Sequence, residues 1–513
     1  MMSAGILQVE GLSIASGQRM IVSDLTFTVR QGEIVALTGK SGSGKTSIAL
    51  ALLGLLPFGL RQTKGNITWH PEGQPAMALP VDIAHWHTIR GSHIGYTQQD
   101  AFSAFDPILR MGEQMVLVIR ERAPLHIDNI ERELRTKMEE VGLHDLDRLW
   151  NSFPHQLSGG QLQRCQICMA IVIGPQLIIS DEPTSAIDKI NQLELLDVYA
   201  MLKAKYNMAI LCITHEEAVV QYLADRVVQL DPTSSLQAPF TEPSPAVPPE
   251  GHAAYLRATQ LTYTHQYGGM MYKQGATVGP IDFVLHRGAC LGIIGESGSG
   301  KSTLAQLLVG LHTPSHGQIW MGEQQIDFSH PEKRKWLRNR IQLVMQDGRG
   351  SLHPFFTVER LLNEVVLMKR KEVPAYTLKP VDMLKEVGLA EEVLHRKPPS
   401  LSGGECLRVS IARALLMEPE VLICDESTAA LDHQTRDGII SLLLRLLKDR
   451  NLSLIFISHD EYIIRGVAQD IVVLAQGRVV EKGPAAQVIR YPTHHMTKKI
   501  FSSYATLGHK RHP

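Results

Sequence analysis

The sequence has 513 residues, more than one ordinary hydrophobic core holds, so we expect about two to four domains. Apolar residues make up 44% of it and charged residues 20%, which excludes a disordered or fibrous protein. The formal net charge is −1 and no stretch reaches the ~18 consecutive apolar residues of a membrane span, so we expect neither nucleic-acid binding nor a direct membrane span.

Short apolar runs in the first half of the chain lead into polar motifs. The runs 34–38, 177–180 and 209–214 predict buried strands of a largely parallel sheet. A glycine-rich loop, GKSGSGKT, follows the first run, and a helix is predicted from residue 46 to residue 56, ending before Pro57. Strand, glycine loop and helix in this order are the P-loop arrangement.

The second half repeats the first. Apolar runs at 290–294, 421–424 and 454–458 again precede polar motifs, and a second glycine loop, GESGSGKS, places Lys301 256 residues after Lys45. The segments LSGGQ and LSGGE, the two Asp-Glu pairs and the two histidines His215 and His459 recur at a constant spacing of 244 residues. An ordered set of motifs that occurs twice indicates two copies of one domain.

A proline-rich segment separates the two copies. Six prolines lie among small polar residues between residues 231 and 252, without a helical or alternating period, which predicts an extended linker. We therefore expect a first domain over residues 1–230, the linker over 231–252, a second domain over 253–485 and a C-terminal tail over 486–513.

The two glycine loops predict nucleotide binding. Without side chains at the glycines, backbone N–H groups can converge on phosphate oxygens, while the lysine contacts the β and γ phosphates and the hydroxyl that follows it ligates Mg²⁺. Glycine-rich turns are common, but two full matches in corresponding places favour ATP sites. The predicted phosphate-binding residues are Gly39, Ser41, Gly42, Ser43, Gly44, Lys45 and Thr46, and Gly295, Ser297, Gly298, Ser299, Gly300, Lys301 and Ser302.

Acidic residues and a histidine end the other predicted strands. Asp181 and Asp425 close apolar runs, where they can face a metal ion, and Glu182 and Glu426 follow as candidate general bases. A helix-capping Asp-Glu pair and an ordinary core histidine are the alternatives. Since both features recur in the second half, we favour catalysis, with His215 and His459 orienting the attacking water. The two glutamates and the two histidines are therefore predicted to be catalytic.

With these motifs the sequence resembles the ABC ATPases. The resemblance implies an α/β fold of two P-loop cassettes, each with a mostly parallel core sheet, an antiparallel β subdomain and a helical subdomain. Gln99 and Gln346 resemble the glutamine that senses Mg²⁺ and the transporter, and we expect them in the catalytic site. The resemblance implies that Mg²⁺ is bound by Thr46, Gln99 and Asp181 in one cassette, and by Ser302, Gln346 and Asp425 in the other.

In that family two cassettes pair head to tail, here within one chain. Each ATP then lies between the glycine loop of one cassette and the signature segment of the other. Residues 39–46 would face Ser402, Gly403, Gly404 and Glu405, and residues 295–302 would face Ser158, Gly159, Gly160 and Gln161.

Smaller motifs resemble one branch of the family. PHQLSGG at 154–160 and the tail YPTHHMT at 491–497 are similar to the ATPases of oligopeptide, dipeptide and nickel importers. The resemblance implies two transmembrane permease subunits, an extracytoplasmic solute-binding protein, a peripheral position on the cytoplasmic face of the inner membrane, and peptides, nickel or opine-like metal chelates as cargo. The alternative is a tandem ABC ATPase that acts on the ribosome, but its long charged linker is missing here.

Overall fold

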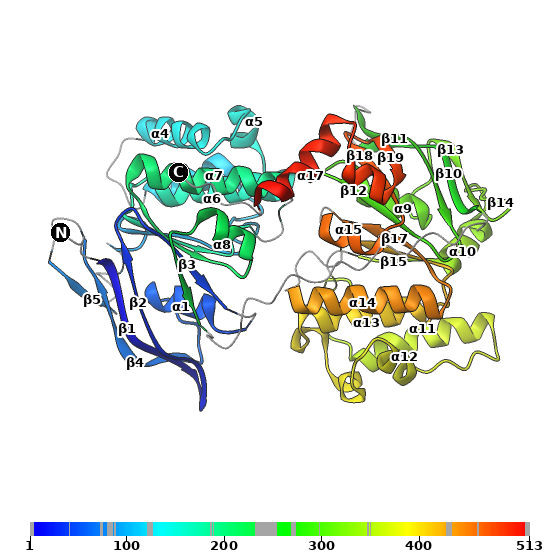
Figure 1. Ribbon diagram of the computed structural model, residues 1–513, viewed down its shortest axis with the longest axis horizontal. Coiled ribbons are helices and arrows are strands. Elements are labelled where there is room, and N and C mark those ends of the chain that lie inside the picture. The colour runs from blue at the N-terminus through cyan, green and yellow to red at the C-terminus, as the bar shows by residue number, and fades with distance from the viewer. Residues whose placement is uncertain are drawn as a thin grey trace. The chain divides into compact units, whose positions relative to one another are not determined.

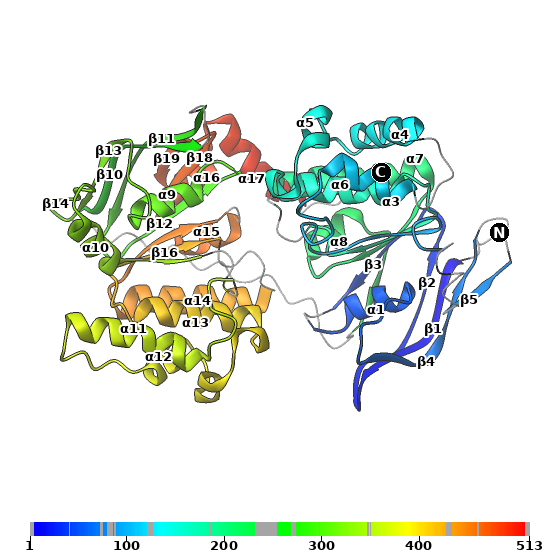
Figure 2. The ribbon, with the colours of Figure 1, turned by 180° about the vertical axis from the view of Figure 1, so that it is seen from behind.

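The structure is a computed structural model, and two compact units are distinguished in it: residues 1–240 with 505–513, and residues 241–504. Each unit is described by itself (Figures 1 and 2). The placements described are those of residues 5–39, 42–71, 75–79, 86, 89–120, 127–184, 187, 189–230, 254–267, 273–296, 298–345, 348, 350–426, 433–458 and 461–507.

The first unit begins with an antiparallel sheet in the order β2-β1-β4-β5. Its inward face is apolar and shares a core with helix α1 and with the parallel sheet of the same unit, because alternate strand residues point to that face. The strands are β1 (Gly5–Ser16), β2 (Arg19–Arg30), β4 (Leu60–Trp69) and β5 (Met77–Leu79).

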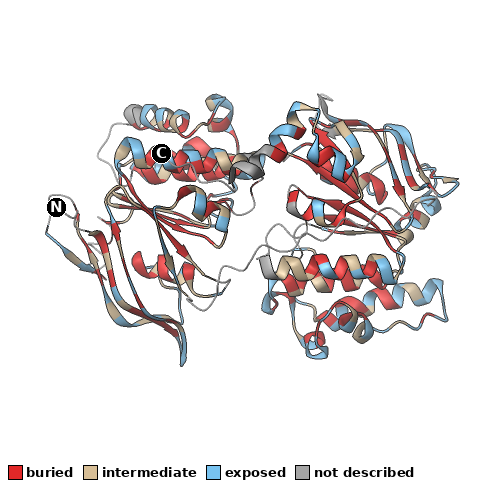
Figure 3. Ribbon diagram, in the orientation of Figure 1, coloured by how far each residue is buried: buried red, intermediate tan, exposed pale blue. Residues whose placement is uncertain are grey.

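The second sheet of this unit is parallel throughout, in the order β6-β7-β8-β3-β9. Every residue of β7 and β8 is buried, so these strands read as continuous apolar runs, and Figure 3 colours them as buried. The strands are β3 (Ile34–Thr38), β6 (Ile94–Thr97), β7 (Leu177–Asp181), β8 (Ala209–Ile213) and β9 (Arg226–Gln229).

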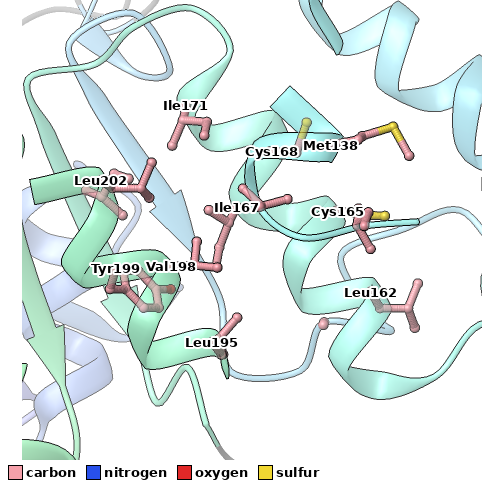
Figure 4. Packing of buried hydrophobic residues seen from close by; sticks show 14 of the residues in the cluster. Met138, Leu162, Cys165, Ile167, Cys168, Ile171, Leu195, Val198, Tyr199 and Leu202 are labelled. Atoms are coloured by element: carbon pink, nitrogen blue, oxygen red, sulfur yellow. The ribbon is translucent and has the colours of Figure 1, made fainter. Parts of the chain in front are cut away.

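Helices cover this sheet and form a separate helical layer beside it. Figure 4 shows α6 and α7 in contact through apolar side chains, with Cys165 and Cys168 inside the cluster. Burial raises the pKa of the Cys165 thiol to about 12, so this thiol is protonated near neutral pH. The helices are α1 (Lys45–Leu52), α3 (Met111–Arg120), α4 (Ile127–Glu140), α5 (Leu146–Asn151), η1 (Pro154–Gln156), α6 (Gly159–Ile171), α7 (Lys189–Tyr206) and α8 (Glu217–Leu223).

The second unit repeats both sheets. Its antiparallel sheet has the order β11-β10-β13-β14, and its larger sheet has the order β15-β16-β17-β12-β18-β19, with β19 antiparallel to β18. The strands are β10 (Ala254–Tyr267), β11 (Lys273–His286), β12 (Cys290–Gly295), β13 (His316–Met321), β14 (Gln324–Gln325), β15 (Ile341–Val344), β16 (Val421–Asp425), β17 (Ser453–Ile457), β18 (Asp470–Ala475) and β19 (Arg478–Pro484).

In the second unit α10 lies between β14 and β15 along the chain, and α16 and α17 follow the last strand, β19. No helix among the described residues combines the length and the apolar character that crossing a bilayer requires. The helices are α9 (Lys301–Leu308), α10 (Pro331–Arg340), α11 (Val358–Glu372), α12 (Pro380–Glu386), η2 (Glu391–His395), η3 (Pro398–Ser400), α13 (Gly403–Leu415), α14 (His433–Asp449), α15 (Glu461–Val467), α16 (Ala485–Arg490) and α17 (His495–Leu507).

The α/β fold with two P-loop cassettes is confirmed, and the six predicted strands lie within one residue of their expected ends. The predicted end of the first helix is wrong. α1 ends at Leu52 because Gly54 adopts φ 62° and the N–H groups of Gly54 and Leu55 bond back to Ala51 and Leu50. This pattern is a Schellman motif, which stops the helix before Pro57 can. The proposed linker, residues 231–252, lies outside the described residues, and the domain boundaries remain predictions.

Candidate nucleotide sites

In the first cassette a glycine loop connects β3 to α1. Gly44 precedes the helix with φ 92°, and a Cβ atom there would lie 2.8 Å from Ile21 and Val22, so the turn requires glycine. Lys45 Nζ donates to the carbonyl of Gly39 at 2.8 Å, and only 6% of Lys45 is exposed. The ammonium group is thereby held inside the loop, beside the N–H groups that open α1.

The second cassette builds the same loop between β12 and α9. Gly300 has φ 96°, and a Cβ atom there would lie 2.9 Å from Val278. Lys301 Nζ donates to the carbonyls of Gly295 at 2.8 Å and Glu296 at 2.9 Å. Two loops of equal geometry, each with a buried lysine at a helix N-terminus, can bind two triphosphates.

Four buried polar atoms at these loops have no hydrogen-bond partner within the described part of the chain. They are Ser43 Oγ and Asp181 Oδ1 in the first cassette, and Ser299 Oγ and Asp425 Oδ1 in the second. Buried polar atoms are nearly always hydrogen-bonded. A set of such atoms without partners, found in both cassettes, therefore indicates that a ligand binds there. Hydroxyl and carboxylate oxygens fit a phosphate and a Mg²⁺ ion, respectively.

The carboxylates of Asp181 and Asp425 lie at the ends of β7 and β16, each next to the hydroxyl after the loop lysine. Burial raises the pKa of both groups; a hydrogen bond from Thr46 or Ser302 and the charge of the loop lysine act in the opposite direction. A bound divalent cation favours the ionised form and reverses the effect of burial. Each aspartate and its neighbouring hydroxyl would hold Mg²⁺.

Glu182 leaves its strand with a left-handed backbone, φ 46°, and its N–H bonds to the carbonyl of Ile213 at 2.8 Å. Its carboxylate accepts a hydrogen bond from Gln99 Nε2 at 2.6 Å and lies 3.0 Å from His215 Nδ1. The structure thus brings together three residues predicted from separate motifs. A carboxylate held by two neighbours at the end of a strand is placed to accept a proton from water.

Glu426 repeats this backbone in the second cassette, with φ 44° and an N–H bond to the carbonyl of Ile457 at 2.9 Å. Its carboxylate pairs with Lys301 Nζ at 3.2 Å. Such strained conformations cost about 1–3 kcal/mol each and cluster at functional sites. Of the residues predicted for the two sites, Ser41, Ser297, Gln346 and His459 lie outside the described residues.

The signature segments form the N-termini of α6 and α13. Ser158 caps α6 by accepting from the N–H of Gln161 at 3.3 Å, and Gln161 Oε1 accepts from the N–H of Ser158 at 3.0 Å. Ser402 and Glu405 form the same capping box, at 3.2 and 2.7 Å. Gly160 and Gly404 allow the first turns to pack closely on the next helix, because a Cβ atom there would lie 3.5 Å from Asn191 and 2.3 Å from Thr435, respectively.

A buried chain of hydroxyl groups, which the sequence patterns did not predict, lies under the first site. Ser180 Oγ lies 2.6 Å from Thr97 Oγ1 and 2.5 Å from Tyr199 OH, which connects β6, β7 and α7 directly behind Gln99 and Asp181. The only sequence signal was that Thr97 and Ser180 are polar residues at the ends of apolar runs. Their contact depends on the order of the strands, which single-sequence patterns leave open.

Comparison with known proteins gives one family. The family model described as ABC transporter matches residues 22–185 and 278–429. The peptidoglycan transport ATP-binding protein YejF of Agrobacterium fabrum is 33% identical over 97% of this chain and 96% of its own length. The glutathione import ATP-binding protein GsiA of Escherichia coli is 30% identical over 98% of this chain and 90% of its own.

A search of solved structures gives cbiO1 of Clostridium perfringens, described as part of the ABC transporter complex cbiONQ. It is 30% identical to this chain, with a TM-score of 0.40. The matched region covers 47% of this chain and 92% of that protein.

Proposed function

This chain belongs to the ABC transporter family and is an ATPase, and from that premise we propose that it powers the import of a peptide-type solute. The observation that carries the proposal is a set of three residues that occurs twice in the chain: a buried loop lysine, an aspartate whose Oδ1 has no hydrogen-bond partner among the described residues, and a glutamate with a left-handed backbone. Two full sets of reactive groups support two turnovers of ATP per transport cycle. Similarity to transport and import ATP-binding proteins over nearly the whole chain supports the transport role.

Each ATP would be held by both cassettes. In this arrangement the loop and carboxylates of the first cassette face Ser402 and its helix, and those of the second face Ser158. The two capped helix N-termini support it, because each offers free N–H groups that attract a γ phosphate. Closing of the cassettes is then linked to ATP binding, and opening to loss of the γ phosphate.

Within each site the chain's own groups have distinct tasks. The loop lysine and N–H groups bind the phosphates, and Mg²⁺, when bound, neutralises charge that develops on them. Glu182 accepts a proton from the attacking water, and its hydrogen bonds to Gln99 and His215 hold the carboxylate in place. By the repeat, Glu426 has the same task, with Gln346 and His459 as its partners.

The partners would be two transmembrane permease subunits, which this chain would contact from the cytoplasmic face of the inner membrane, and an extracytoplasmic solute-binding protein. Exposed apolar side chains follow the glutamine motif in each cassette, where the core connects to the helical layer. Ile108 is 78% exposed before α3, and Phe355 is 76% exposed before α11. Apolar side chains that reach water at equivalent places support a protein contact surface.

We propose peptide-type solutes as cargo, because the similar proteins are named for glutathione import and peptidoglycan transport. Nickel and opine-like metal chelates are the other cargoes that the tail motif suggests. Uptake into proteoliposomes that contain the permeases, the binding protein and this chain tests the proposal. ATP-driven accumulation of a labelled peptide supports it; accumulation of a nickel chelate alone, or export, contradicts it.

The permease surface has its own test. Ile108→Asp and Phe355→Asp should each leave the ATPase rate of the isolated chain unchanged and abolish its stimulation by the permeases. Phe58→Asp is the control, because Phe58 is fully exposed but lies elsewhere on the first cassette. Stimulation that survives both substitutions would place the permeases on another surface.

A further inference from the structure

The two signature helices differ in charge at one position. Gln161 in α6 and Glu405 in α13 both occupy the third position of the helix and both accept a hydrogen bond from the N–H of the capping serine. The capping geometry is therefore shared, and only the charge differs. In α13 a carboxylate lies in the first turn, where Gln161 of α6 is neutral.

A cation accompanies this carboxylate. Arg396 Nη1 lies 3.0 Å from Glu405 Oε1, and the same guanidinium donates to the carbonyl of Ser400. Burial acts to raise the pKa of Glu405, but hydrogen bonds from Ser402 and the charge of Arg396 outweigh it, so the pKa is lowered. Glu405 is thus ionised at neutral pH, and Arg396 neutralises it.

The first cassette lacks both charges. The residue 244 positions before Arg396 is Ser152, whose hydroxyl donates to the carbonyl of Arg148 at 2.7 Å. The segments correspond, since η1 and η3 each begin with a proline two residues after this position. The acid and the base therefore occur together in one cassette, and neither occurs in the other.

The pair has a consequence for phosphate binding. A helix N-terminus attracts an anion through its free N–H groups and its dipole. An ionised carboxylate in the first turn opposes a second anion there, because like charges at short range repel. An arginine bound to that carboxylate removes the net charge and leaves the N–H groups of Gly403 and Gly404 available.

We propose that Arg396 is a positioning residue that neutralises Glu405 and so makes the second signature helix as receptive to the γ phosphate as the first. The inference rests on the proposed sharing of each ATP between the cassettes. It assigns Arg396 to the ATP held by Lys45, across from its own cassette. The pair Arg396–Glu405 in α13 then corresponds to the neutral Gln161 in α6, and the affinity for the γ phosphate is the same at both helices.

The test compares ADP with ATP, because only ATP carries the γ phosphate that the signature helix contacts. In full-length protein with Glu182→Gln and Lys301→Ala, nucleotide binds only at the first loop and is not hydrolysed. Equilibrium titration with labelled nucleotide and Mg²⁺ gives the ratio of the ADP and ATP dissociation constants. Arg396→Gln should lower this ratio about fivefold, as expected for one charge at a helix N-terminus. Adding Glu405→Gln should restore it.

The first cassette offers the reverse experiment. In protein with Glu426→Gln and Lys45→Ala, only the second loop binds nucleotide, and the signature that faces it is neutral. Gln161→Glu should lower the ratio by a similar factor, and Ser152→Arg in addition should raise it again. Arg360→Gln is the control, because Arg360 is 62% exposed on α11 and pairs with Glu364 rather than with the signature.

The outcomes separate this inference from the proposed function. A ratio that Arg396→Gln leaves unchanged at both loops, or a fall that Glu405→Gln does not reverse, overturns the role of Arg396. A reversible fall at the second loop in place of the first supports charge neutralisation and overturns the sharing of ATP between cassettes. A reversible fall at the first loop supports both.

Discussion

The two cassettes share their strand order but differ directly beneath the carboxylates proposed as general bases, Glu182 and Glu426. In the first, Thr97, Ser180 and Tyr199 form a buried chain of hydroxyl groups. The corresponding residues in the second are Val344, Cys424 and Leu443, all buried. Strand pairing is the same, since Thr97 lies beside Ser180 and Val344 beside Cys424.

This difference shows that the same backbone turn at Glu182 and Glu426 can form above either polar or apolar buried side chains. A buried hydroxyl chain is stable only when each member has a partner, whereas apolar side chains need only to fill space. Glu182 and Glu426 nevertheless leave their strands with nearly equal φ angles, 46° and 44°. The buried side chains can vary because the strand order and the turn after each strand fix the backbone of the two glutamates.

Among the described residues, Glu182 bonds to Gln99 and His215, and Glu426 pairs with Lys301. Gln346 and His459, the counterparts of Gln99 and His215 in the second cassette, lie outside the described residues. Equal chemistry in both cassettes is therefore a prediction that single-site variants can break.

The largest expected effect comes from removing the general bases one at a time. Glu182→Gln and Glu426→Gln should each reduce hydrolysis at their own site by about 10²- to 10⁴-fold, the usual contribution of a general base. Total phosphate release should then fall by about half or more in each single variant.

The matched control for these variants is Glu217→Gln, because Glu217 is exposed at the start of α8 and its carboxylate accepts a hydrogen bond from Gln221, away from the glycine loop. An unchanged rate in either Glu182→Gln or Glu426→Gln would show that the cassettes are not equivalent.

A smaller effect, on the free energy of unfolding, should come from exchanging polar and apolar side chains beneath the two glutamates. Val344→Thr places a hydroxyl in the apolar interior of the second cassette and should cost about 1–3 kcal/mol of unfolding free energy. Thr97→Val in the first cassette should cost only about 1 kcal/mol, because Ser180 keeps its bond to Tyr199. Chemical denaturation of each variant measures both values, and a larger loss for Thr97→Val would contradict the argument.

The smallest effect concerns an ionised cluster in the first cassette. Burial acts to raise the pKa of Glu140, but hydrogen bonds from Lys205, Tyr206 and Lys137 lower it to about 2. The folded pKa lies below the unfolded value, so this stability is present above about pH 4.5 and is lost as the pH falls toward 2.

Between pH 6 and pH 3 the unfolding free energy of the wild type should therefore fall by about 1 kcal/mol more than that of Glu140→Gln. Glu139→Gln is the control, since Glu139 is the exposed neighbour. If Glu140→Gln keeps the full pH dependence, the cluster does not stabilise the fold.

Much of the fold followed from local patterns. The apolar runs placed six strands within a residue of their ends, because buried parallel strands read as short continuous apolar segments. The glycine loops placed Lys45 and Lys301 in buried positions at helix starts. The end of α1 was missed, since the bonds of Gly54 and Leu55 to the preceding turn form only when the chain folds back on itself.

The sequence by itself determined the repeat and the P-loops and led to the proposed general bases Glu182 and Glu426, because these features depend on residue types at fixed short spacings. Tertiary structure alone decided which side chains meet: Gln99 with Glu182, Tyr199 with Ser180, and Arg396 with Glu405. Contacts between elements depend on strand order and helix packing, and neither is written into the local period of any one segment.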